Sequence, residues 1–279
     1  RTSAILRGLM KSASNRFDLS LSLTAGLDSR VVLAASKEIK DAASYMTVRQ
    51  IRMPDDYADI TVPSALLSKL GFKHDVVKSS LVIDDKFIEA FKKNVPIPHY
   101  VYAPDAHAIL KYYAQKKVAV TGGTSEVSRS SFRGLLGKPA GEQVTLQDFA
   151  RLQEMGNDTY TRDHYQTWIS GLGNTYNLDI LNLFEWELDD GNWLAMCQLE
   201  FDIAWKDIFT PFNCKALIRT MLSLKQDLMM PPKYEFYYAL ISDLWPEVLS
   251  VPVNPHKKRR NFSSKLKSYV RSRLLPLIR

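Results

Sequence analysis

The sequence predicts an α/β fold, with a parallel sheet of about five strands and flanking helices, followed by a helical C-terminal region. In the first half, short apolar runs alternate with longer helical patterns, which is typical of βαβ units. Two of these runs end in glycine-containing loops. From about Thr145 onward the strand signal disappears and the periodicity becomes helical.

The first predicted strand is Leu19-Ser-Leu-Ser-Leu23, which is followed by a tight turn at Ala25-Gly26. A helix is expected from about Asp28 to Lys37. The second predicted strand lies near Ser44–Arg49, so the two strands are separated by a helix and are expected to be parallel.

The alternation continues with a predicted helix from Tyr57 to Leu70, which Gly71 is expected to cap at its C-terminus. Lys73–Val77 fits a third strand. Lys117–Thr121 fits a further strand that runs into a loop at Gly122-Gly123. Ligands of open parallel sheets bind beyond the carboxyl ends of the strands, so both glycine-containing loops are expected to border one crevice.

We divide the chain into an α/β core (1–144), a helical part (145–254) and a basic C-terminal tail (255–279). The helical part is rich in aromatic residues, which can line a cofactor pocket but at helical spacing more often form core. We favour core for the aromatic side chains of Phe184, Trp186, Trp193, Phe201 and Trp205.

The charge of the chain is concentrated in its tail. The 279 residues carry a net charge of +7, with 46% hydrophobic and 24% charged residues, which is ordinary for a soluble globular protein. The last 25 residues hold nine basic and no acidic residues, so the other 254, with 28 basic and 30 acidic residues, total −2. The tail can form a basic amphipathic helix that binds an anionic surface, or a helix packed on its own domain, which we favour. A nucleic-acid partner is not expected.

Several classes of protein are excluded by simple counts. The two cysteines, Cys197 and Cys214, cannot form a disulfide framework, so we expect a reducing, cytoplasmic compartment. The five histidines are scattered and the cysteines lie seventeen residues apart, which argues against a zinc site. No apolar run is long enough to span a membrane, and no Gly-x-Ser-x-Gly elbow indicates a serine hydrolase. The chain opens at Arg1 without Met, so we expect that a segment precedes it.

The segment Leu23-Thr-Ala-Gly-Leu-Asp-Ser-Arg30 is the part of the sequence that most directly indicates a ligand-binding site. A loop of small and hydroxyl residues between a strand and a helix N-terminus presents backbone N–H groups to a polyanion such as pyrophosphate. A carboxylate at Asp28 can help to hold Mg²⁺ beside phosphates. The alternative is an ordinary helix N-cap, in which Asp28 or Ser29 satisfies the first amides of the helix.

Thr24-Ala-Gly-Leu-Asp-Ser29 resembles the Ser-Gly-Gly-x-Asp-Ser pyrophosphate loop of the N-type ATP pyrophosphatases. The rest of the chain resembles the synthetase domain of asparagine synthetase-like proteins. The segments that carry this resemblance occur in the family's order: Tyr57 to His74, Val120 to Glu126 with Arg129, Asp179 to Asp202, Thr210-Pro-Phe-Asn213, and Leu240 to Pro255. The resemblance implies an adenine nucleotide alpha hydrolase-like fold.

It also implies an ATP-dependent, AMP-forming carbon–nitrogen ligase. ATP adenylates a substrate carboxylate, pyrophosphate leaves, and ammonia or an amine attacks the acyl-adenylate, as in asparagine biosynthesis. Pyrophosphate and nucleotide would be held by Leu23, Thr24, Gly26, Asp28, Ser29, Val48, Gly122 and Gly123. Asp28 and Glu126 would bind Mg²⁺, and Glu126 with either Lys257 or Lys258 would be catalytic. An upstream glutaminase domain or subunit, as in the family's amidotransferases, and a homo-oligomer are further expectations.

Three departures from the family pattern leave alternatives open. Ala25 replaces the first glycine of the usual pair, and Ser125-Glu126 replaces an Asp-Glu pair in the second loop. Nothing in residues 1–17 resembles the glutaminase nucleophile. The chain can therefore be a non-catalytic nucleotide-binding descendant of the family. A tRNA-modifying enzyme with the same pyrophosphate loop is a further alternative, ranked lower because the chain has no cysteine cluster for zinc.

Overall fold

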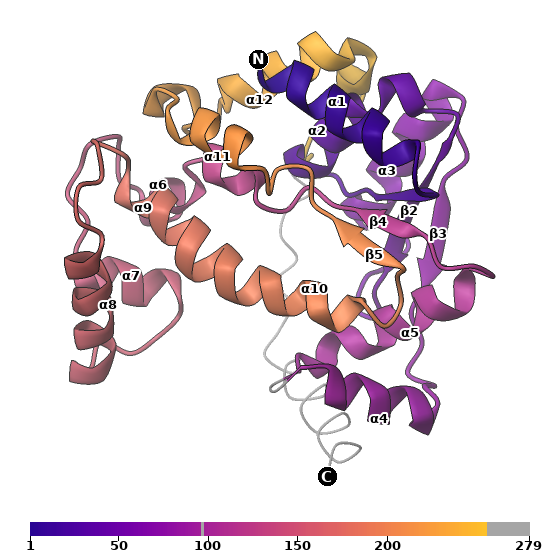
Figure 1. The fold of residues 1–279 in the computed structure, drawn as a ribbon, viewed down its shortest axis with the longest axis horizontal. Coiled ribbons are helices and arrows are strands. Elements are labelled where there is room, and N and C mark those ends of the chain that lie inside the picture. Colours follow the sequence, from indigo (N-terminus) through magenta and orange to yellow (C-terminus); the bar gives the residue numbers. More distant parts are fainter. Residues whose placement is uncertain (96–97, 256–279) are drawn as a thin grey trace.

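The computed structural model describes residues 1–95 and 98–255, and its centre is a five-stranded, all-parallel sheet (Figure 1). The strands are β1 (Leu19–Ser22), β2 (Ala43–Arg49), β3 (Asp75–Lys78), β4 (Val118–Val120) and β5 (Asp207–Phe209). They lie in the order β3-β2-β1-β4-β5, and each neighbouring pair is parallel. The predicted α/β class and strand number are confirmed.

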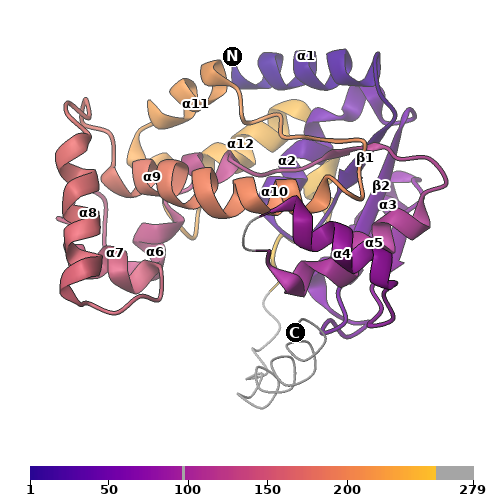
Figure 2. The same ribbon diagram turned by 60° about the horizontal axis from the view of Figure 1, so that its bottom comes forward.

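Helices cover both faces of the sheet. The described α-helices are α1 (Thr2–Ser14), α2 (Leu27–Ala35), α3 (Ala58–Leu70), α4 (Asp85–Asn94), α5 (Ala103–Tyr112), α6 (Ser131–Leu136), α7 (Leu146–Leu152), α8 (Thr159–Gly171), α9 (Ile180–Phe184), α10 (Ala195–Phe201), α11 (Lys215–Leu222) and α12 (Glu235–Leu244). Helices α1, α2, α3 and α12 pack on one face, and α4 and α5 pack on the other (Figures 1 and 2).

The central strands are buried on both sides, and β4 is accordingly a continuous apolar run, whereas β1 alternates leucine with the small residue serine. Leu21 of β1 and Val120 of β4 contribute to the core on the α2 face. Ala119 of β4 points into the core on the α5 face. All three side chains are almost fully excluded from solvent.

A helical arm extends from the sheet (Figures 1 and 2). Helices α7 and α8 pack around a separate small core that includes Phe149, Tyr165 and Phe184. One uninterrupted helical run, residues 180–201, leads from this arm back to the sheet. Its middle part, η4 (Glu185–Leu194), is a π-helix between α9 and α10. Because π-helices are rare and occur frequently at functional sites, this segment draws attention to the side chains it carries.

The expectation that no strand follows Thr145 is wrong. Strand β5 lies in the second half of the chain and completes the sheet by pairing with β4, with Val118 opposite Asp207. A run of three residues is too short to show alternation in sequence, and its strand conformation comes from the backbone hydrogen bonds of the edge it extends.

Several local expectations can be compared with the structure. Gly71 caps α3 in the left-handed conformation, with φ of 81°, as predicted. Of the aromatic side chains expected in the core, Phe184 and Trp205 are buried, whereas Trp193 is 46% exposed. The basic stretch from residue 256 to 279 lies outside the described residues. Within residues 1–95 and 98–255, no helix has both the length and the apolar character needed to cross a membrane.

Candidate functional site

The candidate site lies at the carboxyl end of β1, where the strand order reverses. Strand β2, the next in the chain, pairs with one side of β1, and β4 pairs with the other. In open α/β sheets, ligands bind in the crevice at such a switch point. The loops that follow β1 and β4 therefore meet where a ligand is expected.

The loop after β1 is held in shape by its own side chains. The backbone N–H of Thr24 donates to Ser29 Oγ at 3.1 Å, and that of Gly26 donates to Thr24 Oγ1 at 3.2 Å. Asp59 of α3 accepts from the N–H of Ala25 at 2.9 Å. The φ angle of Ala25 is not in the positive range, so its methyl group introduces no backbone strain.

Helix α2 begins at Leu27, with Gly26 at the N-cap and no side-chain capping bond. Neither Asp28 nor Ser29 caps the helix, so the alternative that explained the motif as an ordinary N-cap is wrong. The first amides of a helix lack partners within the helix and favour a negative charge at its N-terminus. An uncapped N-terminus at the sheet's switch point suits an anionic ligand.

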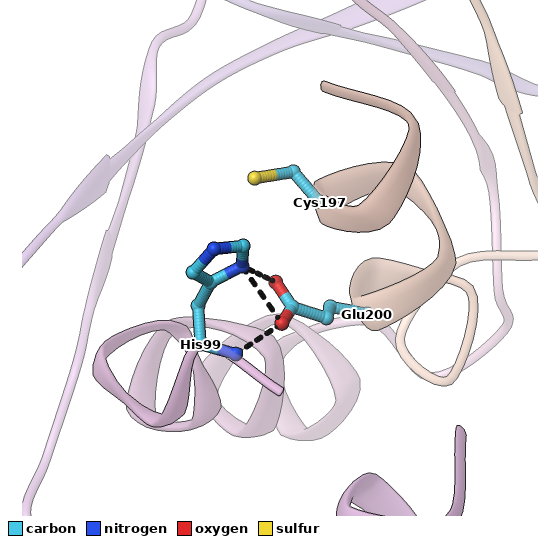
Figure 3. A group of neighbouring side chains, drawn as sticks. All are labelled: His99, Cys197 and Glu200. Carbon is cyan, nitrogen blue, oxygen red and sulfur yellow. Dashed lines mark hydrogen bonds and ion pairs between the residues drawn. The ribbon is translucent and has the colours of Figure 1, made fainter. Parts of the chain in front are cut away.

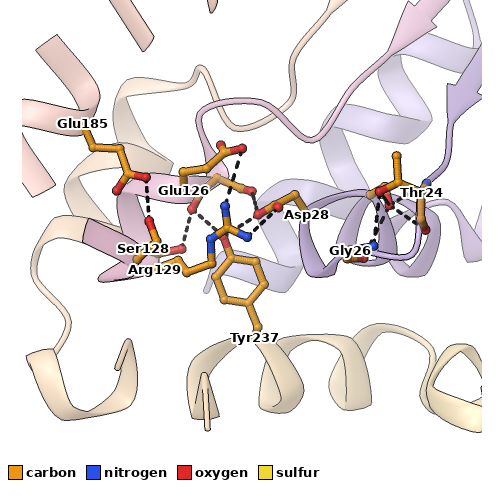
Figure 4. A network of polar contacts seen from close by, with 11 residues as sticks. Thr24, Gly26, Asp28, Glu126, Ser128, Arg129, Glu185 and Tyr237 are labelled. Carbon is orange, nitrogen blue, oxygen red and sulfur yellow. Dashed lines mark hydrogen bonds and ion pairs between the residues drawn. The ribbon is translucent and has the colours of Figure 1, made fainter. Parts of the chain in front are cut away.

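The Asp28 carboxylate is the meeting point of three segments (Figure 4). Its Oδ1 accepts from Ser125 Oγ at 2.7 Å, and its Oδ2 accepts from Arg129 Nη1 at 2.9 Å. The Tyr237 hydroxyl of α12 lies 3.1 Å from Oδ1 and 2.5 Å from the carbonyl oxygen of Ser125. These contacts tie the loop after β4 and helix α12 to the start of α2.

Two glycines allow the elements to approach this closely. A Cβ at Gly122 would lie 2.6 Å from the carbonyl carbon of Asp28 and 2.8 Å from its oxygen. A Cβ at Gly123 would lie 2.8 Å from a methyl carbon of Leu194 in η4. The first contact is with backbone, which cannot rotate away, so Gly122 is required for the two loops to meet.

Arg129 lies among carboxylates from several elements. Besides its ion pair with Asp28, its Nη2 is 3.9 Å from Oε1 of Glu126. Burial lowers the pKa of the Arg129 guanidinium, but Asp28 and the neighbouring acids outweigh this effect and hold the pKa above its ordinary value. The guanidinium is therefore a permanent positive charge at the centre of the site.

Three of the nearby carboxyl groups are perturbed. Burial, and then the charge of Asp28, raises the pKa of Glu126 to about 8. Burial, and then Asp189 and Asp28, raises the pKa of Asp190 to about 7. Burial also raises the pKa of Glu185 well above its ordinary value, although Ser131 donates a hydrogen bond to its Oε1.

Each of these three carboxyl groups has one oxygen without a partner. Within the described part of the chain, Oε2 of Glu126, Oε2 of Glu185 and Oδ2 of Asp190 are buried and accept no hydrogen bond. Buried polar atoms in native proteins are nearly always paired with protein, water or a ligand. Unpartnered oxygens beside a guanidinium and an uncapped helix therefore mark this place as a candidate binding site.

The structure brings most of the sequence-predicted residues to one edge of the sheet. Leu23, Thr24, Gly26, Asp28 and Ser29 form the first loop, and Gly122, Gly123 and Glu126 lie in the second. Val48 is half-buried near the end of β2, the strand beside β1. Lys257 and Lys258 lie outside the described residues.

Three residues of the site are not among those predicted from the sequence: Tyr237, Asp190 and Glu185. Tyr237 sits in an aromatic run of α12, where nothing in the sequence distinguishes it from its neighbour Tyr238. Glu185 and Asp190 come from η4, and a π-helix leaves no recognisable period in sequence. The one sequence signal that pointed to this region was the resemblance of the segment around Glu185 to a segment of the family.

A cavity of about 560 Å³ lies elsewhere, between the helical arm and the end of α11. Arg133 lines it and pairs with Asp179, and both side chains are about 95% buried. None of its lining residues belongs to the loops after β1 and β4. We place the candidate site at the loops, because the unpartnered carboxylate oxygens and the uncapped helix lie there.

Fold and site together define an α/β protein with an all-parallel, five-stranded sheet and a polar cluster at its switch point. Comparison with models of known protein families and with curated proteins gives no match for the chain.

Proposed function

We propose that the chain is an ATP-dependent, amide-forming synthetase of the asparagine synthetase kind. It would adenylate a carboxylate, release pyrophosphate and transfer ammonia or an amine to the acyl group. The observation that carries this proposal is the meeting of the Thr24–Ser29 loop with the Gly122–Glu126 loop at the switch point of a parallel sheet. The adenine nucleotide alpha hydrolase-like arrangement and the cytoplasmic location belong to the same proposal.

The first loop has the chemistry needed to bind pyrophosphate. The hydroxyl groups of Thr24 and Ser29 lie 3.1 Å apart beside the uncapped start of α2. Arg129 adds a fixed positive charge next to that helix. Hydrogen-bond donors and a guanidinium held in advance at the place where negative charge develops stabilise the departure of pyrophosphate.

The carboxylates fit a role in holding Mg²⁺. A carboxylate oxygen has two lone pairs, and Oδ2 of Asp28 accepts only from Arg129 among the described residues. Oε2 of Glu126 is buried and unpartnered. Asp28 and Glu126 would hold the ion through these oxygens, and bound Mg²⁺ supplies charge neutralisation on the phosphates.

Glu126 is also suited to remove a proton from the attacking nitrogen. A general base works best when its pKa lies close to the working pH, and the pKa of Glu126 is about 8. With Oε2 on the ion, the other oxygen, Oε1, which lies 3.9 Å from Arg129 Nη2, would accept the proton. Arg129 would keep Glu126 ionised for part of the population near neutral pH.

The C-terminal segment reaches the same loop. Arg30 of α2 is buried and donates to the carbonyl oxygens of Val248, Val251 and Pro252. The N–H of Asn254 donates to the carbonyl oxygen of Ala25 at 2.9 Å. The described chain therefore returns to the loop after β1 just before it ends at residue 255.

This path supports the proposal that a lysine of the pair Lys257 and Lys258 stabilises the transition state. The proposal also includes ammonia or an amine as the nitrogen donor. It further includes an upstream glutaminase domain or subunit and a homo-oligomeric state.

The non-catalytic alternative has two observations in its favour. Arg129 already neutralises Asp28, and Ser125 occupies the position expected to be acidic. A site built this way can bind a nucleotide without turning it over. Residues 1–254 carry a net charge of −2, and the basic residues that the tRNA-modifying alternative would use lie in 257–279, outside the described residues.

Carboxylate-dependent exchange of labelled pyrophosphate into ATP tests the proposal. We expect exchange with at least one acid from a broad panel in the presence of Mg²⁺. Asp28→Asn, which keeps the shape of the side chain, should abolish exchange, whereas Asp85→Asn, at an exposed position in the first turn of α4, should not. ATP binding without exchange by any acid would establish the non-catalytic alternative. Full exchange in Asp28→Asn would refute the assignment of the loop.

A further inference from the structure

A second polar cluster lies away from the two loops, where the segment before α5 meets α10 (Figure 3). Cys197 and Glu200 project from α10, and His99 precedes the short 3-10 turn at Tyr100–Tyr102. One nitrogen of His99, the sulfur of Cys197 and a carboxylate oxygen of Glu200 all lie within 4.8 Å of one another. Cys197 and Glu200 are three residues apart on the helix and therefore share a face.

The Glu200 carboxylate is positioned firmly. Its side chain is fully buried, and Oε1 accepts hydrogen bonds from the backbone N–H of His99 and from His99 Nδ1, the latter at 3.0 Å. Oε2 lies 3.2 Å from the same ring nitrogen. No lysine or arginine of the described ranges forms an ion pair with Glu200. A buried carboxylate is costly unless a cation compensates its charge, so the cluster lacks a positive partner other than His99.

We propose that His99, Cys197 and Glu200 form a binding site for Zn²⁺. An imidazole nitrogen, a thiolate and a carboxylate are the three ligand types that zinc accepts together, whereas Mg²⁺ and Ca²⁺ prefer oxygen alone. With bonds of about 2.0–2.3 Å, the ligand atoms of a tetrahedral site lie roughly 3.3–3.6 Å apart. The His99 and Glu200 atoms are already at about this separation, and the Cys197 sulfur needs only a small movement.

The surroundings support three protein ligands and one open position. The Tyr102 ring packs edge-on against the His99 ring, with the ring centroids 5.7 Å apart, and this contact helps to orient the imidazole. About a third of the His99 side chain is exposed, which leaves a path for the ion and for a water or a small ligand in the fourth position. Catalytic zinc sites have three protein ligands and an open position, whereas structural zinc sites have four protein ligands.

In the sequence, the wide spacing of the histidines and cysteines argues against a zinc site, but the fold brings distant residues together. His99 and Cys197 are far apart along the chain, and the third ligand is a glutamate, which a count of histidines and cysteines does not include. The cluster shares no residue with the loops after β1 and β4. The site would bind the metal whether or not the chain is a synthetase.

Metal titration of the purified chain after treatment with a chelator tests the proposal. We expect one equivalent of Zn²⁺ to bind, and Co²⁺ to give the near-ultraviolet charge-transfer absorption of a cobalt–thiolate bond. Cys197→Ser should abolish this absorption, while Cys214→Ser, which changes the other cysteine, should keep it. His99→Ala should weaken Zn²⁺ binding at least about tenfold, and His107→Ala should not.

Three outcomes would overturn the proposal. One is the absence of a bound equivalent at micromolar Zn²⁺. A second is a cobalt–thiolate band that survives in Cys197→Ser. His99→Ala removes a partly exposed side chain, so the fold should tolerate it, and unchanged Zn²⁺ affinity in this folded variant would also exclude the site.

Discussion

Gly122→Ala is expected to separate the two loops of the candidate site. The new Cβ would lie 2.6 Å from the carbonyl carbon of Asp28, 2.8 Å from its oxygen and 2.9 Å from its Cβ. Carbon atoms in contact lie about 3.5–4.0 Å apart, so the shortfall is about 1 Å. All three atoms belong to the start of α2 rather than to the end of a flexible side chain.

Overpacking of this kind costs about 1–3 kcal/mol, because the strand ends must move apart. A loss of that size lowers the melting temperature by about 2–4 °C per kcal/mol in a domain of 150–250 residues, and by somewhat less in a longer one. The shift also lengthens the hydrogen bond from Ser125 to Asp28, so we expect ATP affinity to fall together with stability.

Thermal unfolding and ATP titration of Gly122→Ala measure both effects. Gly8→Ala is the matched control, because a Cβ at Gly8 in helix α1 meets nothing within 4 Å. Alanine should stabilise that helix by up to about 1 kcal/mol. If Gly122→Ala unfolds at the same temperature as the unmodified chain and binds ATP equally well, the two loops do not touch as described.

Two more predictions concern the polar cluster. The folded-state pKa of Glu126, about 8, exceeds its ordinary value of 4.5, so the folded protein holds a proton that the unfolded chain releases, and stability should fall as the pH rises from about 5 to 8.5. Urea unfolding at several pH values measures this loss of stability. In Glu126→Gln the loss should be smaller by roughly 2–4 kcal/mol. If the free energy of unfolding depends on pH equally in Glu126→Gln and in the unmodified chain, the raised pKa of Glu126 is contradicted. Glu89→Gln, which changes an exposed glutamate, should show the same pH dependence as the unmodified chain. Tyr237→Phe deletes a hydroxyl that contacts Asp28 and the Ser125 carbonyl, so it should cost about 1 kcal/mol and weaken ATP binding. Tyr238→Phe, at the partly exposed neighbour, should do neither, and indistinguishable effects of the two changes would exclude a role for the Tyr237 hydroxyl.

The sequence predicted the elements whose signals are local. Leu19–Ser22 alternates leucine with the small residue serine in a strand that is covered on both faces, and Gly71 occurs where a left-handed residue ends α3. Both follow from properties of a few adjacent residues. The resemblance of Thr24–Ser29 to a pyrophosphate loop located the edge of the sheet at which the polar cluster lies.

Features that depend on distant residues could not be predicted in this way. Strand β5 is recognisable only beside β4, because three residues carry no period of their own. The partners of Asp28 come from α12 and from the loop after β4, and each looks ordinary in its own segment. The π-helical winding of η4 has no signal in its own ten residues, and the packing of Leu194 against Gly123 joins segments far apart in the chain.

That winding has a geometric consequence. The helical run of residues 180–201 carries Glu185 near Arg129 at one end and the Cys197–Glu200 pair at the other, with the π-helical turns between them. Because backbone bonds in a π-helix span five residues instead of four, its angular step per residue is smaller than that of an α-helix. The number of residues wound in this way therefore sets the rotational phase between the two polar clusters. A single insertion or deletion within 185–194 would turn one of them away from its partners.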